Sequence, residues 1–394
     1  MSEIDNSIVE LRNFSQELKI DDYIPHKSLF LDGFDYKEKE TNSFLFSTLY
    51  LLTNNKFLIE HFLNFNPDQD KNEDLAFLKM IENLVQYIKE LKDDNNKNNF
   101  DKLSDSIKQF RKFLGNEKLD PRYLMRHILV KALKTQKKNS LSNEILPNGN
   151  NNNIIISEGE SSFLENILLN LDSFNFISTS SISSSFQKNF ENSFSLLNDS
   201  QQGEIEKDIK DIIIKVQAVD GKNNYICTNF IIFNLSEESK NKYKIVDCFK
   251  NYLDQIKHTE IKSKIFYKLP ETIIILLSFG KDKEKPENCL YNFSENLDFS
   301  KDEYAGCLDE KLRSKKYILS GLIACKYPKQ YKEFFYTFCR KTKSDNDKKY
   351  YIYNSKELRV HDIENVDNKL KKLETKDQEN TSYPYVLVYN EIKN

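Results

Sequence analysis

The 394-residue sequence contains no tryptophan, no long apolar run and no excess charge of either sign. No apolar run reaches the roughly 18 consecutive residues that a membrane-spanning helix needs. No apolar signal-peptide segment follows Met1. From these absences we expect a soluble intracellular protein, cytoplasmic or nuclear, that makes no contact with membranes.

The charges are balanced, with 58 lysines and arginines against 61 aspartates and glutamates, for a net charge of −3. Proteins that bind nucleic acid usually carry a basic excess or a basic stripe. We therefore expect no nucleic-acid partner. The length suits one large domain or two to three ordinary ones, and it is sufficient for a sizeable core.

The cysteines and histidines are scattered rather than grouped. No two cysteines form the C-x-x-C motif that structural zinc sites commonly use. We therefore expect no metal and no cofactor, and we expect reduced thiols that fill small buried gaps. The residues concerned are Cys227, Cys248, Cys289, Cys307, Cys325, Cys339, His26, His61, His127, His258 and His361.

Residues 41–54, which read TNSFLFSTLYLLTN, form the segment around which the chain is organised. Leu45, Leu49 and Leu52 have the i, i+4, i+7 spacing of a helix buried on one face. The Asn-Ser pair before the apolar run is typical of a helix N-cap. The positive end of such a helix would also favour an anionic nucleophile at Ser43. A plain capping role explains the same residues.

The order of residues in this segment resembles the nucleophile box of the ubiquitin-specific proteases, which reads approximately GNTCYLNSxLQxL. Aligned without gaps, Ser43 corresponds to the family's cysteine and Ser47 to its serine, while residues 49–52 correspond to LQxL. The resemblance implies that the nucleophile helix is kept and that its thiol is lost.

Helical periodicity continues through the first third of the chain. The spacing predicts helices over residues 56–65, 74–92, 100–114 and 122–133. Pro121 after Asp120 is typical of a helix start. At this place the family carries a QQDxxEFL box, of which only the aspartate is present here. An ordinary capped helix explains Asp120 equally well.

Residues from about 136 to 205 are rich in asparagine, glycine and serine. Such low-complexity composition predicts an insertion without a packed core of its own. One amphipathic stretch, residues 163–171, is the exception and could dock as a helix. A role in partner binding stays open for this insertion.

The second half of the chain is rich in β-branched and aromatic residues, with turn residues between the runs. The pattern predicts strands over residues 209–218, 225–235, 261–269 and 272–279, and a helix over 245–255. The dipeptide at Asp220 and Gly221 predicts a hairpin between the first two strands.

Six segments of this half resemble further motifs of the same family, in the family's order. Residues 269–279 are similar to LPxxLIIxLKRF, one residue shorter and without its Lys-Arg. Residues 295–299 are similar to PexLDL, 317–323 to YxLxGVI, 335–340 to the strand of GHYTAYCR, 350–354 to WYxFN/D, and 385–389 to YxLfY. The zinc-binding C-x-x-C pairs of the family's fingers are absent.

The resemblance implies an α+β, papain-like cysteine protease fold. After a lead-in over residues 1–39, a ubiquitin-specific-protease-like domain would span 40–390. Its helical thumb would cover about 40–135. Its largely antiparallel β palm and fingers would follow the insertion, from about 208 to 390.

The catalytic positions of the family hold unsuitable residues in this chain. The chemistry needs a cysteine, a histidine that takes its proton, and an aspartate or asparagine that orients the imidazole. By the resemblance, Ser43 replaces the cysteine, Phe334 replaces the histidine, Asn354 matches the orienting residue, and Glu38 falls on the oxyanion-hole asparagine. Loss of one triad member already lowers kcat by about 10⁴-fold, and a carboxylate repels a developing oxyanion. We expect no functional catalytic residue at these positions.

Four interpretations follow from the sequence. The first is a catalytically inactive pseudoenzyme that binds a protein partner or belongs to a larger assembly. The second is a protein that still binds ubiquitin or a ubiquitin-like protein. The third is an active deubiquitinase with non-standard residues, for instance Cys325 or Cys339 paired with His361. The fourth is an unrelated α+β protein.

Overall fold

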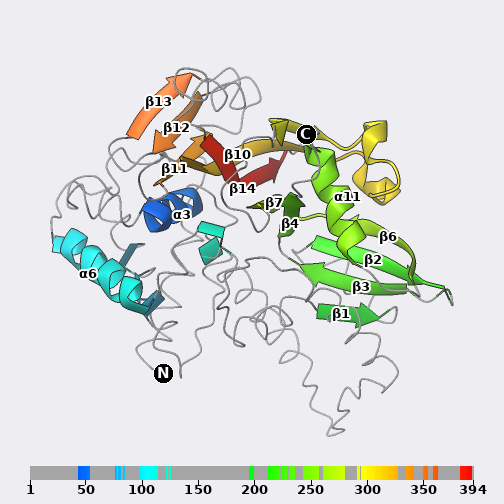
Figure 1. Ribbon diagram of the computed structural model, residues 1–394, viewed down its shortest axis with the longest axis horizontal. Helices are drawn as coiled ribbons and strands as arrows, with labels where there is room; N and C mark the ends of the chain where they lie inside the picture. Colours follow the sequence, from blue (N-terminus) through cyan, green and yellow to red (C-terminus); the bar gives the residue numbers. More distant parts are fainter. Residues whose placement is uncertain are drawn as a thin grey trace, which may run out of the picture. The chain divides into compact units, whose positions relative to one another are not determined.

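The chain is described from a computed structural model, shown in Figure 1. The structure describes residues 43–53, 98–113, 195–198, 212–219, 221, 223–228, 230–235, 243–256, 261–279, 291–292, 294–326, 334–340, 349–353, 358–362 and 382–392, together with parts of 76–84 and 121–125. Two compact units make up the chain. The first consists of residues 1–135 and 320–386, and the second of 136–319 and 387–394.

The first unit combines helices with an antiparallel meander. Its helices are α3 (Ser43–Thr53) and α6 (Asn98–Phe113), and the described residues in 76–84 and 121–125 are also helical. Its strands are the second part of β10 (Lys316–Lys326), β11 (Phe334–Arg340), β12 (Lys349–Tyr353), β13 (Leu358–Asp362) and the first part of β14 (Ser382–Glu391). Neighbouring strands from β10 to β13 pair antiparallel.

Helix α6 packs through one apolar stripe. Leu103, Ile107 and Phe110 are buried, whereas the charged residues between them face solvent. The Phe110 ring lies 5.2 Å from the ring of Phe77, measured between centroids. This is the packing that an amphipathic helix with a repeat of 3.6 residues requires.

The second unit contains a four-stranded antiparallel sheet with the order β1-β3-β2-β6. Its strands are β1 (Ser195–Asn198), β2 (Ile212–Ala218), β3 (Asn223–Thr228) and β6 (Ile261–Lys268). The predicted hairpin between β2 and β3 is confirmed. The Gly221 N–H donates to the Ala218 carbonyl at 3.0 Å, and Gly221 has a φ of +89°, which a glycine adopts without a Cβ clash.

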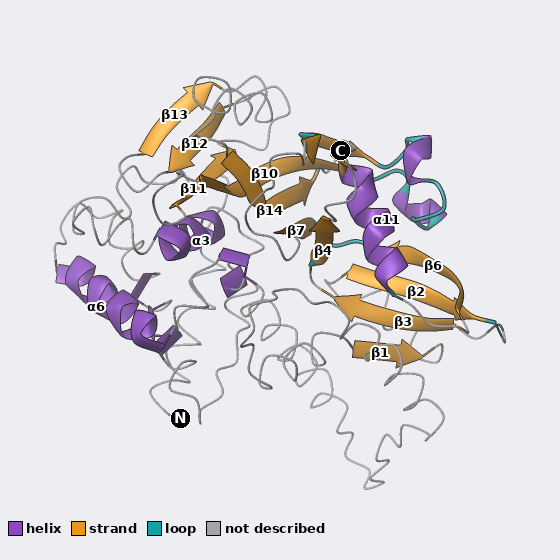
Figure 2. Ribbon diagram, viewed as in Figure 1, coloured by secondary structure: helices purple, strands orange, loops and turns teal. Residues whose placement is uncertain are grey.

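The larger sheet has the order β13-β12-β11-β10-β14-β7-β4, with β9 (Asn296–Asp298) paired to β10 (Figure 2). Its pair β4 (Ile231–Leu235) and β7 (Thr272–Phe279) runs parallel. The short strands β5 (Tyr243–Lys244) and β8 (Tyr291–Asn292) form a separate two-stranded sheet and also run parallel. These two pairs are exceptions to the mainly antiparallel pairing of the described strands. A parallel pair needs a long crossover, and between β4 and β7 the chain contains α11 (Ile245–Gln255) and β6.

Aromatic side chains from several elements form the core of the second unit. The ring of Phe249, on α11, lies 5.4 Å from Phe266, 5.5 Å from Phe299 and 6.0 Å from Tyr304. Phe299 also lies 5.4 Å from the ring of Tyr317 on β10. All five are buried. Their edge-to-face and tilted geometry is the arrangement that aromatic quadrupoles favour.

Most of the predicted elements that the structure describes are confirmed, with shifted ends. Helices predicted over 41–54, 100–114 and 245–255 correspond to α3, α6 and α11. The run at 225–235 is not one strand but two, β3 and β4, which belong to different sheets. Strands β1 and β13 were not predicted. The helix predicted over 56–65 and most of the 136–205 insertion lie outside the described residues.

Among the helices that the structure describes, none combines the length and the apolarity that crossing a bilayer requires.

Candidate functional site

The candidate site begins at the first residue of α3. Ser43 opens this helix and is only 4% exposed. The sequence predicts burial on one face, but every residue from Ser43 to Leu51 is buried. A helix that is apolar on all sides is expected to lie inside a fold rather than on its surface. The polar residues Ser47 and Thr48 are buried as well and therefore need partners.

The hydroxyl groups of these residues and of Thr337 form hydrogen bonds with backbone carbonyls, and one of these bonds connects α3 to β11. The Thr337 hydroxyl donates to the Ser47 carbonyl at 2.9 Å, and both groups are buried. The hydroxyls of Ser47 and Thr48 donate to the Phe44 carbonyl at 3.0 and 2.7 Å. Such bonds to the preceding turn are common for serine and threonine inside helices. The Thr337 bond therefore places α3 directly against β11.

Two arginines lie over aromatic rings in the same unit. The guanidinium carbon of Arg111, on α6, lies 5.8 Å from the ring centroid of Phe44, and that of Arg122 lies 4.1 Å from Tyr385. Burial lowers the pKa of the Arg111 guanidinium from its usual value, but an arginine stays cationic in proteins. Both contacts are favourable cation–π interactions, and that of Arg111 helps to hold α6 beside the first turn of α3.

Two of the four expected site positions are placed by the structure. Ser43 opens α3, and Phe334 is the first residue of β11, opposite Lys326 in the ladder with β10. The elements that carry them are the two that the Thr337 bond joins. Asn354 and Glu38 lie outside the described residues. A phenylalanine carries no group that accepts a proton, unlike the histidine expected at this position from the resemblance.

The structure does not assemble the alternative cysteine–histidine pair. Cys325 and Cys339 are buried inside β10 and β11, which confirms the expectation that Cys325 belongs to the core. Burial raises the pKa of the Cys339 thiol, which disfavours the reactive thiolate. His361 shares a row of the sheet with Tyr350 and Arg340, whereas Cys339 belongs to the adjacent row. Adjacent rows alternate between the faces of a sheet.

Cys248 and Cys307, which belong to the second unit, are also buried and free. Burial raises the pKa of Cys248, with a further contribution from Asp247, and burial raises the pKa of Cys307 to about 11. In the described part of the chain, no group of three or more histidine, cysteine, aspartate or glutamate side chains is placed to hold a metal ion. Cys248, Cys307, Cys325 and Cys339 are therefore packing residues rather than nucleophiles.

Sequence reasoning missed Thr337 and Arg111. The only signal for Thr337 was the threonine in the strand motif at residues 335–340. A hydroxyl inside an apolar strand reveals its partner only when the opposing element is known. Arg111 carried no signal, because a cation near the end of a helix is ordinary.

No protein-family model matches the sequence, and no curated protein matches it either. Comparison with solved structures finds the Ubp8-Sgf11-Sgf73-Sus1 SAGA DUB module, with 13% identity and a TM-score of 0.46, covering 100% of this chain and 76% of that chain. A second structure, of the SAGA Ubp8/Sgf11/Sus1/Sgf73 DUB module, has 12% identity and a TM-score of 0.47, with 98% and 73% covered.

A third solved structure is that of an essential yeast splicing factor, with 12% identity and a TM-score of 0.41, covering 95% of this chain and 70% of that chain. Like the protease family suggested by the sequence, this chain combines helices with antiparallel sheet. Values this low do not establish membership of a family.

Proposed function

We propose that this protein is a catalytically inactive, ubiquitin-specific-protease-like pseudoenzyme that acts as a protein-interaction module or scaffold. The proposal combines the motif order at residues 41–54 and 269–389 with the residues that occupy the catalytic positions. Helix α3 and strand β11 contact each other, and they carry Ser43 and Phe334.

The observation that carries the proposal is the burial of Ser43 at the start of α3, on an element that contacts the strand carrying Phe334. A serine hydroxyl becomes a competent nucleophile only when an adjacent base takes its proton. A phenylalanine ring accepts no proton. Cys325 and Cys339, the described thiols of the same unit, are buried inside β10 and β11, where burial disfavours the reactive thiolate.

Hydrolysis tests the inactivity directly. The purified full chain is incubated with a ubiquitin–fluorophore amide and, separately, with a ubiquitin whose tail carries a thiol-reactive electrophile. We expect no fluorophore release above buffer and no covalent adduct, because loss of a triad member alone lowers kcat by about 10⁴-fold. An authentic ubiquitin-specific protease is the positive control.

Ser43→Ala is the matched variant for this assay. Turnover by the wild-type chain that disappears in Ser43→Ala would overturn the proposal. Adduct formation mapped to one cysteine would instead support the active deubiquitinase with a relocated thiol.

The scaffold role is tested by partner identification in two steps. Cross-linking and mass spectrometry on the native protein name the neighbouring chain, and the two purified proteins are then mixed and their Kd is measured. We expect a stoichiometric complex whose Kd is unchanged in Ser43→Ala, because scaffolding does not need the hydroxyl. Failure of every cross-linked candidate to bind the purified full chain would contradict the role.

Ubiquitin binding is the second candidate function, favoured only by the family resemblance. Titration of isotope-labelled ubiquitin with the full chain distinguishes it from the scaffold role. Chemical-shift changes confined to one face of ubiquitin would favour it, and unchanged spectra at high protein concentration would exclude it.

A further inference from the structure

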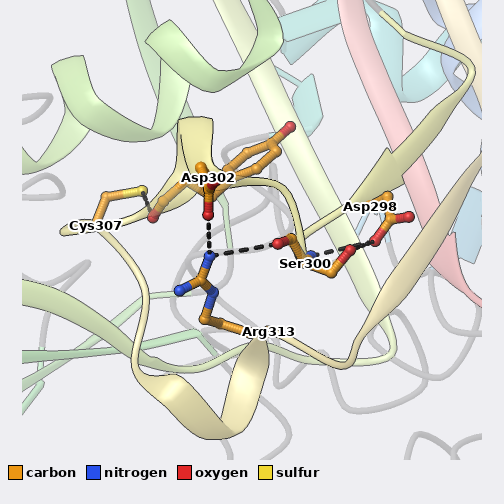
Figure 3. A network of polar contacts seen from close by, with 6 residues as sticks. Asp298, Ser300, Asp302, Cys307 and Arg313 are labelled. Carbon is orange, nitrogen blue, oxygen red and sulfur yellow. Dashed lines mark hydrogen bonds and ion pairs between the residues drawn. The ribbon is translucent and has the colours of Figure 1, made fainter.

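The turn between β9 and η5 (Asp302–Tyr304) carries an exposed serine held by a small polar network, shown in Figure 3. The Ser300 hydroxyl donates to Oδ1 of Asp298 at 2.7 Å, and its backbone N–H donates to the same oxygen at 3.2 Å. Nη2 of Arg313 donates to the Ser300 carbonyl at 3.3 Å and to Oδ1 of Asp302 at 3.2 Å. One guanidinium therefore already lies beside Ser300.

The ion pairs around this serine are exposed and easily exchanged. The side chain of Asp302 is fully exposed and that of Arg313 is 37% exposed. Nζ of Lys316 lies 3.5 Å from Oδ2 of Asp298. Exposed pairs such as these contribute little to stability. A stronger anion at Ser300 could therefore take Arg313 from Asp302 at small cost.

We propose that Ser300 is a phosphorylation site for an acidophilic serine/threonine protein kinase and that Arg313 binds the resulting phosphate. The Ser300 Oγ attacks the γ-phosphorus of ATP. The Oγ–P bond forms, the bond from that phosphorus to the β,γ-bridging oxygen breaks, and ADP leaves. The hydroxyl proton passes to the base of the kinase. This modification goes beyond the proposed scaffold function and does not depend on it.

Two of the three residues that follow Ser300 supply the recognition, and Lys301 between them and the serine does not. Asp302 and Glu303 occupy the second and third positions after the serine, and their side chains are 102% and 37% exposed. A kinase whose substrate groove is lined with lysine and arginine complements two carboxylates at these positions. Ser294 provides an internal comparison, because it is also exposed but is followed by Glu295, Asn296 and Leu297.

Phosphorylation would rearrange the turn in a defined way. The hydroxyl that now donates to Asp298 would be lost, and a dianion would stand beside that carboxylate and repel it. The hydrogen bond from the Ser300 hydroxyl is the main cause of the lowered pKa of Asp298. The phosphate oxygens would accept strong charge-assisted bonds from the Arg313 guanidinium. Because the neighbouring Phe299 is packed in the aromatic core, the change would reach α11.

The first test is phosphorylation of the full chain by a purified acidophilic kinase with ATP, followed by mass-spectrometric site mapping. We expect one phosphoryl group on Ser300, none in Ser300→Ala, and an unchanged rate in the control Ser294→Ala. Glu303→Gln should slow the reaction by about 10-fold, because it removes one recognition charge. An unmodified Ser300, under conditions that fully convert an acidic control peptide, would overturn the proposal. So would an unchanged rate in Glu303→Gln.

The second test asks whether Arg313 binds the phosphate. Phosphoserine has a second pKa of about 6, which a neighbouring cation lowers. The ³¹P resonance of the modified protein is titrated in the wild-type chain and in Arg313→Gln. Asp298 is present in both, so the difference reports Arg313 alone. We expect the lower pKa in the wild type, and superimposable curves would refute the role of Arg313.

Discussion

Ser43 shows how one residue changes what an otherwise suitable helix end can do. The positive end of α3 would stabilise a thiolate, but a hydroxyl ionises too weakly to benefit. The helix instead uses hydroxyl groups structurally, through Ser47, Thr48 and Thr337. At the scale of single residues, the buried hydroxyl and thiol groups therefore contribute to packing and stability.

Replacing Thr337 with valine keeps the shape of the side chain and removes the hydroxyl that donates to the Ser47 carbonyl. We expect the free energy of unfolding to fall by about 1 kcal/mol, because a buried acceptor loses a partner. Urea denaturation measures the change. Thr337→Ser, which keeps the donor, should lose less than Thr337→Val. The reverse order would mean that the methyl group, and not the bond, holds β11 to α3.

The buried thiol of Cys307 predicts a loss of stability in alkali. Burial raises its pKa from 9.0 to about 11 in the folded state. Below pH 9 the thiol is protonated in both states. As the pH rises from 9 to 11, the unfolded thiol ionises first, so the free energy of unfolding falls.

Cys307→Ser is the matched variant, because it keeps a donor for the Tyr304 carbonyl, to which the thiol donates at 3.1 Å, and does not titrate in this range. Burial is the main cause of the raised pKa of Tyr304, and Cys307 is a smaller one, so most of the Tyr304 contribution is common to both proteins. We expect Cys307→Ser to show a shallower decline between pH 9 and 11 in denaturation experiments. Equal slopes would contradict the assignment.

At the scale of elements, α11 is the helix whose formation is most directly explained by its sequence. Its buried residues recur at helical spacing, and the Phe249 side chain enters the aromatic core. Asp247, in its first turn, accepts the Lys244 backbone N–H at 2.7 Å. A carboxylate at this end satisfies a free N–H group and also interacts favourably with the helix dipole.

Asp247→Ala should lower the free energy of unfolding by about 1 kcal/mol, the usual cost of a lost helix cap. Asp254→Ala is the control, because Asp254 is an exposed carboxylate near the opposite end of the same helix. There the helix dipole disfavours an anion, so its removal should leave stability unchanged or slightly higher. Chemical denaturation of both variants measures the effect, and equal losses would show that capping is not its cause.

At the scale of the whole molecule, β10 and β14 each contribute residues to both units. The last part of β14 belongs to the second unit. There Glu391 pairs with Lys315 at 2.9 Å, Asn390 accepts from Thr272 at 2.9 Å, and the Tyr389 hydroxyl donates to the Ser294 carbonyl at 2.9 Å. The second unit is therefore completed by the C-terminal strand.

Deletion of residues 387–394 should abolish the cooperative unfolding of the protein. It removes the buried side chains of Leu387, Val388 and Tyr389, each contributing about 1.5–3 kcal/mol. Their sum approaches the total stability of a typical domain, about 5–15 kcal/mol. Deletion of residues 393–394 removes no described contact and is the control. A sharp thermal transition in the longer deletion, followed by circular dichroism, would contradict this role of β14.

Local sequence was sufficient for elements whose own period reveals them. The spacing of apolar residues in α3, α6 and α11, and the Asp-Gly turn before β3, depend on residues close together in the chain. Local sequence was insufficient to predict β13 or the division of residues 225–235 between two sheets. Short strands are defined by partners distant in the sequence, and no local period identifies those partners.

The sequence by itself determined the helical segments, the hairpin and the identity of the residues at positions 43 and 334, because residue identity and local spacing are properties of the chain alone. Only the tertiary structure decided that α3 is buried on every described side, that Thr337 joins it to β11, and that β4 and β7 run parallel. Burial, partner choice and strand direction depend on residues brought together from distant parts of the chain, and those contacts form only when it folds.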